Sequence, residues 1–180
     1  MRRPIFLDRD GVINVDIVPY VCRLEDFRLF DWTVEALTLL DRAGFDIFVI
    51  SNQQGVALGL TPPEVLSQVD AAIQDAIAPY GFQIKSFYYC TAHDGESHPW
   101  RKPAPGMILA ARDEFGLDLE SAFMIGDKDT DMECGIRAGC RPLLVMSGVT
   151  PHGGEKWFAH PPERVFESLL EAAVWVTSGA

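Results

Sequence analysis

The sequence predicts a doubly wound α/β fold, in which helices flank a parallel sheet of five or more strands. Two observations support this prediction. Short apolar runs alternate along the chain with longer amphipathic stretches, and most of these runs are apolar over nearly their full length. Strands that are apolar on both faces are typical of parallel sheets covered on both sides, and strand–helix alternation is typical of right-handed crossover connections.

Five segments are predicted as strands because each is a short apolar run bounded by polar or turn-forming residues. They cover residues 4–7, 46–51, 85–90, 122–125 and 142–146. Five segments are predicted as helices from their amphipathic spacing and their end signals. They cover residues 33–43, 62–78, 105–115, 130–138 and 162–174.

Local chemistry supports several helix ends. In "TPPE", Thr61 is expected to cap a helix that begins at Pro62, with Glu64 completing a capping box. Glycines at positions 44, 116 and 139 follow three of the predicted helices, where they suit left-handed caps.

Composition restricts the function classes. A chain of 180 residues fits one domain, 1–180, and its net charge of −11 disfavours nucleic acid and anionic membranes as partners. No apolar run approaches the roughly 20 residues that cross a bilayer. The cysteines, which are Cys22, Cys90, Cys134 and Cys140, form no CxxC pair. We therefore expect a cytoplasmic monomer that acts on a small molecule.

Polar residues cluster where three of the predicted strands end, and a basic pair precedes another predicted helix. Ligands of doubly wound folds bind at the carboxyl ends of the strands, so these clusters are the candidate site. They are Asp8 and Asp10; Ser51, Asn52 and Gln53; Arg101 and Lys102; and Asp127, Lys128 and Asp131.

Each cluster also has a purely structural explanation. The Asp8/Asp10 pair suits a turn with a helix cap, Asp127 suits a helix N-cap, and Arg101 with Lys102 suits a solvated pair. Because all of these clusters fall in order on one expected edge of the sheet, a shared site explains them better together.

Four segments carry a resemblance to a known family. The segments "FLDRDGVIN", "VISNQQGVALG", "RKPAPGM" and "MIGDKDTDM" resemble the four motifs of the haloacid dehalogenase superfamily. Within it they are similar to the D,D-heptose 1,7-bisphosphate phosphatases and the related histidinol-phosphatases. The resemblance runs from residue 4 to about residue 146, and it implies a Mg²⁺-dependent phosphatase. We expect no large cap domain, because no insertion long enough for one lies between Asp10 and Ser51 or between Gly55 and Arg101.

The resemblance also implies roles for single residues. Asp8 would be the nucleophile that forms an aspartyl-phosphate, and Asp10 would act as general acid and then as general base. Mg²⁺ would be held by Asp8, Asp127 and the main-chain carbonyl of Asp10. Crowding by carboxylates is expected to raise the pKa of Asp10 enough for it to carry a proton.

The remaining motif residues would support the transfer. Lys102 and Ser51 would contact the phosphoryl group, which carries the charge that develops during transfer. Asp131 would orient Lys102 or a metal-bound water, although a first-turn acid favoured by the helix dipole explains it nearly as well. Lys128 gives the GDK form expected of the heptose phosphatases.

Only loops are expected to cover the open side of the site. Asn14, Asp16 and Tyr20 are candidates to reach a sugar, and Asn52 and Gln53 are further candidates for substrate contacts. Arg101 would bind the phosphate that is not cleaved, because its fork of donors matches two phosphate oxygens. A surface-paired arginine remains the alternative.

The related phosphatases usually carry a zinc loop with Cys-x-His and Cys-x-Cys pairs. The corresponding segment, "YYCTAHDGESHPWRKP", retains Cys90, His93 and His98 but has no Cys-x-Cys pair. Because structural zinc sites use four ligands, we predict no zinc. A heptose bisphosphate is the expected substrate, with histidinol phosphate as one alternative and a non-catalytic phosphate-binding domain as another.

Overall fold

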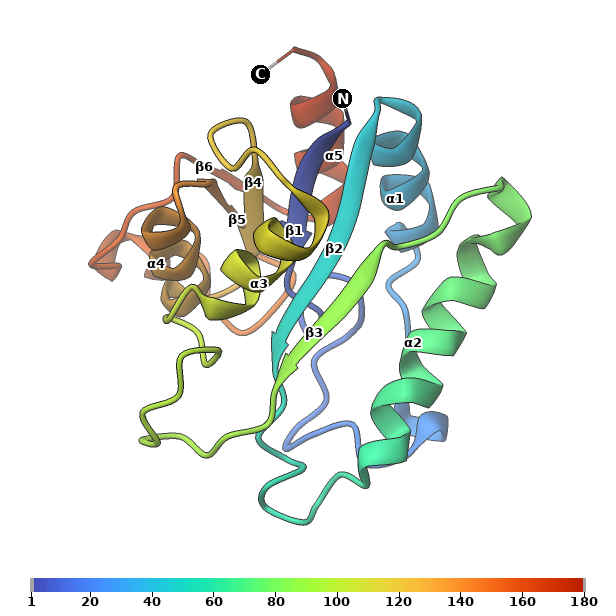
Figure 1. Ribbon diagram of the computed structural model, residues 1–180, viewed down its shortest axis with the longest axis vertical. Coiled ribbons are helices and arrows are strands. Elements are labelled where there is room, and N and C mark those ends of the chain that lie inside the picture. The colour runs from blue at the N-terminus through green and yellow to red at the C-terminus, as the bar shows by residue number, and fades with distance from the viewer. Residues whose placement is uncertain (1, 180) are drawn as a thin grey trace.

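The computed structural model describes residues 2–179, and its six strands form one sheet in which all neighbouring strands are parallel. The strand order is β3-β2-β1-β4-β5-β6, so β1 lies near the centre between β2 and β4 (Figure 1). The strands are β1 (Arg3–Leu7), β2 (Phe45–Asn52), β3 (Ser86–Cys90), β4 (Phe123–Gly126), β5 (Arg141–Val145) and β6 (Arg164–Phe166).

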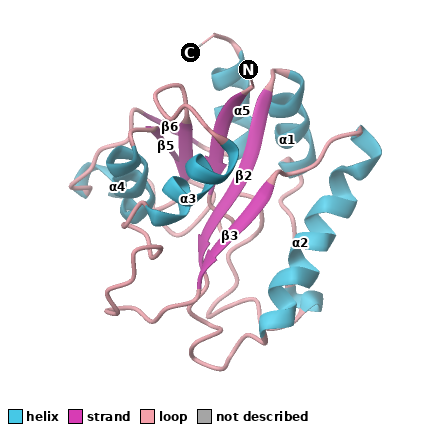
Figure 2. Cartoon of the chain, in the orientation of Figure 1, coloured by secondary structure: helices cyan, strands magenta, loops and turns pink. Residues whose placement is uncertain are grey.

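Helices cover both faces of this sheet (Figure 2). The α-helices are α1 (Thr33–Arg42), α2 (Pro63–Ile77), α3 (Gly106–Phe115), α4 (Asp129–Ala138) and α5 (Leu169–Thr177). Short 3-10 turns occur at η1 (Leu24–Asp26), η2 (Ala78–Tyr80) and η3 (Gly154–Trp157).

Two apolar cores lie on opposite sides of the sheet because side chains alternate along each strand. Ile5 and Leu7 of β1 join the core that α1, α2 and α5 cover, whereas Phe6 between them joins the core under α3 and α4. The predicted fold class is therefore confirmed, including the absence of a large cap within residues 2–179.

All five predicted strands and the first four predicted helices agree with the structure to within one residue at each end. Gly116 and Gly139 adopt the expected left-handed caps, with φ angles of 65° and 87°. None of the helices in residues 2–179 is both long and apolar enough to cross a membrane.

Two local predictions were wrong. The predicted helix at 162–174 is instead β6, which pairs with β5, followed by α5, which is capped by Ser168. Pairing with β6 satisfies the free backbone N–H and C=O groups along the edge of β5. Sequence periodicity does not show which distant segment will pair with a strand. The expected Thr61 cap is also absent: α2 begins at Pro63, and the buried Thr61 hydroxyl donates to the Val21 carbonyl at 3.3 Å.

Candidate active site

The carboxyl ends of β1, β2 and β4 bring the predicted clusters together. Asp8 follows β1, and its N–H donates to the Ile125 carbonyl of β4 at 2.9 Å. Ser51 lies near the end of β2, and Asp127 directly follows β4. Since β1 lies between β2 and β4, these three ends converge on one point at the edge of the sheet.

Lys102 is the cation at this point. Its Nζ lies 2.8 Å from Asp8 Oδ1 and 2.6 Å from Asp131 Oδ1, and it donates to the Ile50 carbonyl at 3.1 Å. Burial alone would lower the pKa of Lys102, but the carboxylates of Asp131 and Asp8 raise it. The amine is therefore positively charged and held in one place by three acceptors.

Asp131 has two structural tasks. While Oδ1 binds Lys102, Oδ2 accepts hydrogen bonds from the N–H groups of Asp127 and Lys128 at 3.2 and 3.1 Å. It therefore holds the lysine and also accepts from the backbone at the start of α4, which are the contacts that both explanations of this acid require. The alternative explanation of Asp127, that it serves as the N-cap of α4, was wrong, because Lys128 occupies the N-cap position.

Asp127 is a second fully buried acid of the site. Its side chain is fully buried, Oδ2 accepts from the N–H of Val149 at 2.9 Å, and Oδ1 has no hydrogen-bond partner. Burial, together with the nearby Asp131 and Asp8, raises the pKa of Asp127 to about 7. A buried carboxylate oxygen without a donor is the kind of ligand that a cation would complete.

The carboxylates of Asp8, Asp127 and Asp131 offer oxygens that lie within 4.8 Å of one another. Asp131 already uses both of its oxygens, which leaves Asp8 and Asp127 as the side chains that can hold a cation. Two carboxylates next to a space for waters and phosphate oxygens match the donor set of Mg²⁺. The residues therefore fit a divalent cation.

Asp10 lies in a different environment from the one expected. Its carboxylate accepts two bonds from Arg9 Nη2, both at 3.0 Å, one from Asn14 at 2.9 Å and one from Gln53 at 2.6 Å. Burial would raise the pKa of Asp10, but the Arg9 charge and these hydrogen bonds lower it. The predicted rise was wrong because donors, rather than other carboxylates, surround this group.

Three predicted residues have positioning contacts in the structure. Asn14, expected to reach the substrate, is fully buried and donates to Asp10 and to the Val15 carbonyl, so that prediction is corrected. Gln53 lines the pocket but donates to Asp10 and to Ser51 Oγ. Asn52 exchanges two hydrogen bonds of 3.0 Å with the backbone of Lys102, which ties β2 to the basic motif.

Sequence reasoning missed Arg9, which lies between the two motif aspartates and is only 1% exposed. Its guanidinium pairs with Asp10 and lies 5.6 Å from the ring of Tyr89, whose hydroxyl donates to Asp70. An arginine that closely follows an apolar strand can become buried, and a buried arginine needs an anionic partner. The position of Arg9 after β1 was therefore the sequence signal that could have identified it.

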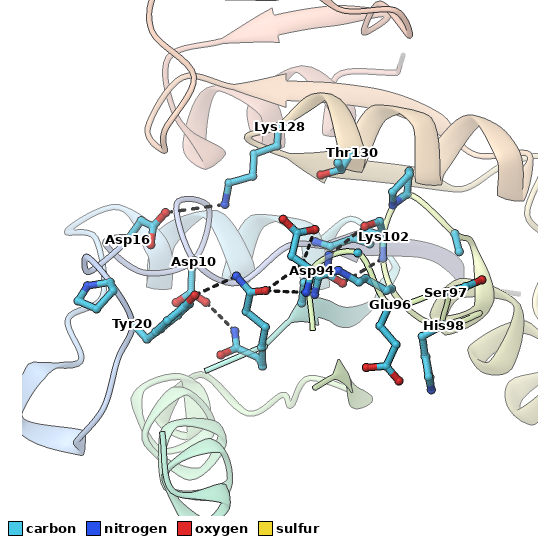
Figure 3. Close-up of a pocket in the computed structure, with 18 of the residues that line it drawn as sticks. Asp10, Asp16, Tyr20, Asp94, Glu96, Ser97, His98, Lys102, Lys128 and Thr130 are labelled. Atoms are coloured by element: carbon cyan, nitrogen blue, oxygen red, sulfur yellow. Dashed lines mark hydrogen bonds and ion pairs between the residues drawn. The ribbon is translucent and has the colours of Figure 1, made fainter. Parts of the chain in front are cut away.

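A pocket of about 770 Å³ opens above the carboxylates. Figure 3 shows Lys128 and Asp16 pointing toward each other across it, with Nζ and Oδ2 3.8 Å apart. Tyr20 lies on one side and Glu96, Ser97 and His98 lie on the other. A narrower chamber of about 50 Å³, lined by Asp8, Ser51, Lys102 and Asp131 among others, continues the pocket downward past Asp10 and Thr130.

Arg101 lines the large pocket beside Lys102. Nη1 donates to the Ala92 carbonyl at 2.8 Å, and Nη2 donates to Gln54 Oε1 at 3.2 Å and pairs with Asp94 at 3.2 Å. Its side chain is only 14% exposed, so it is not part of a freely solvated basic pair, but its ion pair with the exposed Asp94 leaves the surface-paired alternative open.

The candidate zinc ligands lie apart from the carboxylates, on β3 and the loop after it. Cys90 is buried, and its Sγ lies 3.5 Å from His98 Nδ1, which also accepts from the Trp100 N–H at 3.1 Å. His93 is exposed on the same loop. The prediction of no zinc remains a prediction. All four cysteines, each within the described residues, are unpaired.

Comparisons with known proteins agree on one family. Residues 99–172 match the HAD-hydrolase-like family model. The chain is 40% identical to the D-glycero-D-manno-heptose-1,7-bisphosphate 7-phosphatase of Chlorobaculum tepidum, across 93% of this chain and 90% of that protein. It is 34% identical to the D-glycero-beta-D-manno-heptose-1,7-bisphosphate 7-phosphatase of Pseudomonas putida, across 80% of this chain and 82% of that protein.

Solved structures agree with the sequence comparisons. The crystal structure of the D,D-heptose 1,7-bisphosphate phosphatase of B. bronchiseptica, complexed with magnesium and phosphate, superposes with a TM-score of 0.88 at 29% identity, covering 99% of both chains. The corresponding enzyme of Burkholderia thailandensis gives a TM-score of 0.72 at 27% identity, covering 98% of this chain and 99% of that one.

Proposed function

Because this chain belongs to the haloacid dehalogenase superfamily and to its heptose 1,7-bisphosphate 7-phosphatase family, we propose that it removes the 7-phosphate from a D-glycero-D-manno-heptose 1,7-bisphosphate. The reaction is phosphoric monoester hydrolysis, and the curated relatives carry this activity in their names.

One observation supports the chemistry most directly: Lys102 bridges Asp8 and Asp131 within the narrow chamber, near Asp127 Oδ1, which accepts no hydrogen bond. A carboxylate that attacks an anionic phosphoryl group needs positive charge close by. Lys102 supplies a fixed positive charge 2.8 Å from the Asp8 carboxylate.

Asp8 is the proposed nucleophile. Its Oδ1 is held by the Arg9 N–H at 2.7 Å and by Lys102 at 2.8 Å, so its other oxygen is available to attack phosphorus. The new Asp8–phosphorus bond forms as the bond from phosphorus to the sugar oxygen breaks, and Asp10 gives that oxygen a proton. Water then attacks the aspartyl-phosphate, loses a proton to Asp10, and releases phosphate and free Asp8.

Asp8, Asp127 and the main-chain carbonyl of Asp10 are the proposed ligands of Mg²⁺, which when bound offsets the negative charge of the phosphoryl group. Ser51 is proposed to donate to the phosphoryl oxygens, since its hydroxyl already accepts from Gln53 and its proton is free to turn toward the chamber. Lys128 and Asp131 support the site through the contacts described above.

Asp10 begins the cycle ionised because Arg9, Asn14 and Gln53 all donate to it. We propose that it takes up a proton from solvent only when the substrate binds, and that it then gives this proton to the leaving oxygen. The phosphate brings negative charge next to Asp10, and a neighbouring like charge raises the pKa of a carboxyl group.

Recognition of the rest of the substrate is assigned to the large pocket. Its volume of about 770 Å³ admits a phosphorylated seven-carbon sugar, and its lining includes Arg101, Lys128, Tyr20 and Asp16. Arg101 is the proposed contact for the second phosphate, because its guanidinium already binds an anion, the carboxylate of Asp94.

Release of inorganic phosphate tests the proposal. With Mg²⁺, the wild-type protein should hydrolyse the heptose 1,7-bisphosphate much faster than histidinol phosphate, and EDTA should abolish the reaction. Faster hydrolysis of histidinol phosphate would favour the alternative substrate, and equally poor rates on both would refute both assignments.

We also propose that the protein works as a cytoplasmic monomer. The four unpaired cysteines support a reducing compartment. Size-exclusion chromatography with light scattering should give the 20.0 kDa mass of one chain, and a mass of twice that value would refute the monomer.

A further inference from the structure

We infer that Gln54 is a positioning residue that joins three segments around the large pocket and sets the specificity for a substrate with a second phosphate. This inference rests on the proposed function. Gln54 lies directly after the "SNQ" motif, lines the pocket and is half-buried, and no catalytic role accounts for it.

The Gln54 side chain makes three hydrogen bonds to two other parts of the chain, so that three segments meet at this residue. Nε2 donates to the Tyr20 hydroxyl at 2.9 Å, in the loop after β1. Oε1 accepts from the Asp94 N–H at 3.0 Å, in the loop after β3, and from Arg101 Nη2 at 3.2 Å. The amide therefore uses both its donor and its acceptor, and its orientation is determined by these partners.

The loop at 91–99 needs such a tether. Most of its residues are exposed, and the backbone hydrogen bonds described within it are local, such as Glu96 N–H to the His93 carbonyl at 3.1 Å. Arg101 binds its first turn through the Ala92 carbonyl, and Gln54 binds the backbone of Asp94. An exposed loop with few buried contacts opens at low free-energy cost, so these hydrogen bonds govern its position.

The other side of the pocket is fixed through the same short segment. A Cβ atom on Gly55 would lie 3.0 Å from Tyr20 Cγ and 2.6 Å from Thr61 Oγ1, so the Tyr20 ring packs directly on the Gly55 backbone. Packing of the ring on Gly55 and hydrogen bonding of the hydroxyl to Gln54 together place Tyr20 opposite the loop that carries Asp94.

Gln54 therefore controls the group proposed to bind the second phosphate. It shares Arg101 with Asp94, whose carboxylate is 86% exposed and leaves easily, so a phosphate can replace Asp94 while Gln54 keeps the guanidinium in place. The reacting phosphoryl group lies in the narrow chamber, whose lining does not include Gln54. Loss of Gln54 should weaken binding of the distal phosphate more than it slows the chemistry.

Gln54→Met tests the inference, because methionine has a similar length and forms no comparable hydrogen bonds. Gln68→Met makes the same change on the exposed side of α2 and is the matched control. Each protein is assayed with the heptose bisphosphate and with an aryl monophosphate, which has no second phosphate.

We expect Gln54→Met to lower the ratio of kcat/KM for the bisphosphate to kcat/KM for the aryl phosphate by about tenfold, mainly through KM, since about 1.4 kcal/mol of lost binding corresponds to tenfold. Gln68→Met should leave the ratio at the wild-type value. A ratio within twofold of wild type, or an equal loss on both substrates, would overturn the inference.

Hydrogen exchange provides a readout that does not depend on the substrate. The Asp94 amide should exchange at least several-fold faster in Gln54→Met than in wild type or Gln68→Met, and unchanged exchange would refute the tether itself. If wild-type protein fails to hydrolyse the bisphosphate, the proposed function fails and the specificity role falls with it, while exchange still decides whether Gln54 holds the loop.

Discussion

Replacing Asp127 with asparagine should make the metal-free protein more stable while removing its activity. The carboxylate of Asp127 is fully buried and faces Asp8 and Asp131, and its Oδ1 accepts no hydrogen bond, with only the Lys128 ammonium near it at 3.6 Å. Asparagine has the same shape, can still accept from the Val149 N–H and carries no charge. Its amide can also donate to a neighbouring carboxylate.

The magnitude follows from the pKa of Asp127, which rises from 3.8 to about 7. At about 1.36 kcal/mol per pH unit, a shift of roughly three units corresponds to about 4 kcal/mol. Above pH 7, ionisation of Asp127 lowers the free energy of unfolding of the metal-free protein by this full amount. Because part of the cost belongs to Asp131, we expect Asp127→Asn to raise the free energy of unfolding by about 2 to 4 kcal/mol at pH 8.

The pH dependence has a definite sign. Between the two pKa values the folded state keeps a proton that the unfolded state has lost, so Asp127 lowers stability progressively as pH rises from about 4 to about 7. The advantage of Asp127→Asn over wild type should therefore shrink by about 2 kcal/mol or more between pH 8 and pH 5, since about two pH units of the shift are then removed.

Urea unfolding in EDTA at pH 8 and pH 5 measures both quantities. Asp75→Asn, at an exposed position on α2, is the control for the loss of one carboxylate. Addition of Mg²⁺ should stabilise wild type and leave Asp127→Asn unaffected, because binding to the folded state is what stabilises it. The reasoning is refuted if Asp127→Asn is no more stable than wild type at pH 8, or if its advantage does not change with pH.

Three further predictions concern the same region. Asp8→Asn should lower phosphatase turnover by more than about a thousandfold while phosphate binding with Mg²⁺ persists, and near-normal turnover would contradict a covalent mechanism. Lys102→Met should lower the free energy of unfolding by about 3 to 5 kcal/mol at pH 8, because it leaves Asp8 and Asp131 unpaired in a buried site; urea unfolding measures this, and a smaller loss than 1 kcal/mol would contradict the ion pairs. Metal analysis of protein purified without chelators should find less than one zinc per chain, and a stoichiometric zinc would show that the loop with Cys90 binds it after all.

Two of the candidate acids were predictable because each lies next to a strong local signal. Asp8 and Asp127 directly follow apolar strands, and parallel strands place their carboxyl ends at one edge. Lys102 has no such strand before it, and only the resemblance of its motif pointed to the phosphoryl group. The structure brings the three residues together: Lys102 Nζ lies 2.8 Å from Asp8 Oδ1, and carboxylate oxygens of Asp8 and Asp127 lie within 4.8 Å of each other.

The partners of Asp10 were not predictable in the same way. Its pKa depends on how close Arg9, Asn14 and Gln53 approach, and Gln53 lies 43 positions away in the chain. The sequence shows that Asp8 and Asp10 are close together in the chain. It does not show which hydrogen-bond donors will lie next to Asp10 after folding. The expectation of a raised pKa failed for this reason.

Local order along the chain determined the alternation of strands and helices, most of their limits, and the placement of the acidic motifs at one edge of a parallel sheet. These features depend on side-chain periodicity and caps over a few consecutive residues, so they can be read before folding. Tertiary structure alone decided that 164–166 pairs with β5, that Arg9 is buried against Asp10, and that Gln54 joins the pocket loops. Those outcomes depend on distances between segments far apart in the chain, because a hydrogen bond or a pKa shift exists only when packing brings the two groups within a few ångströms.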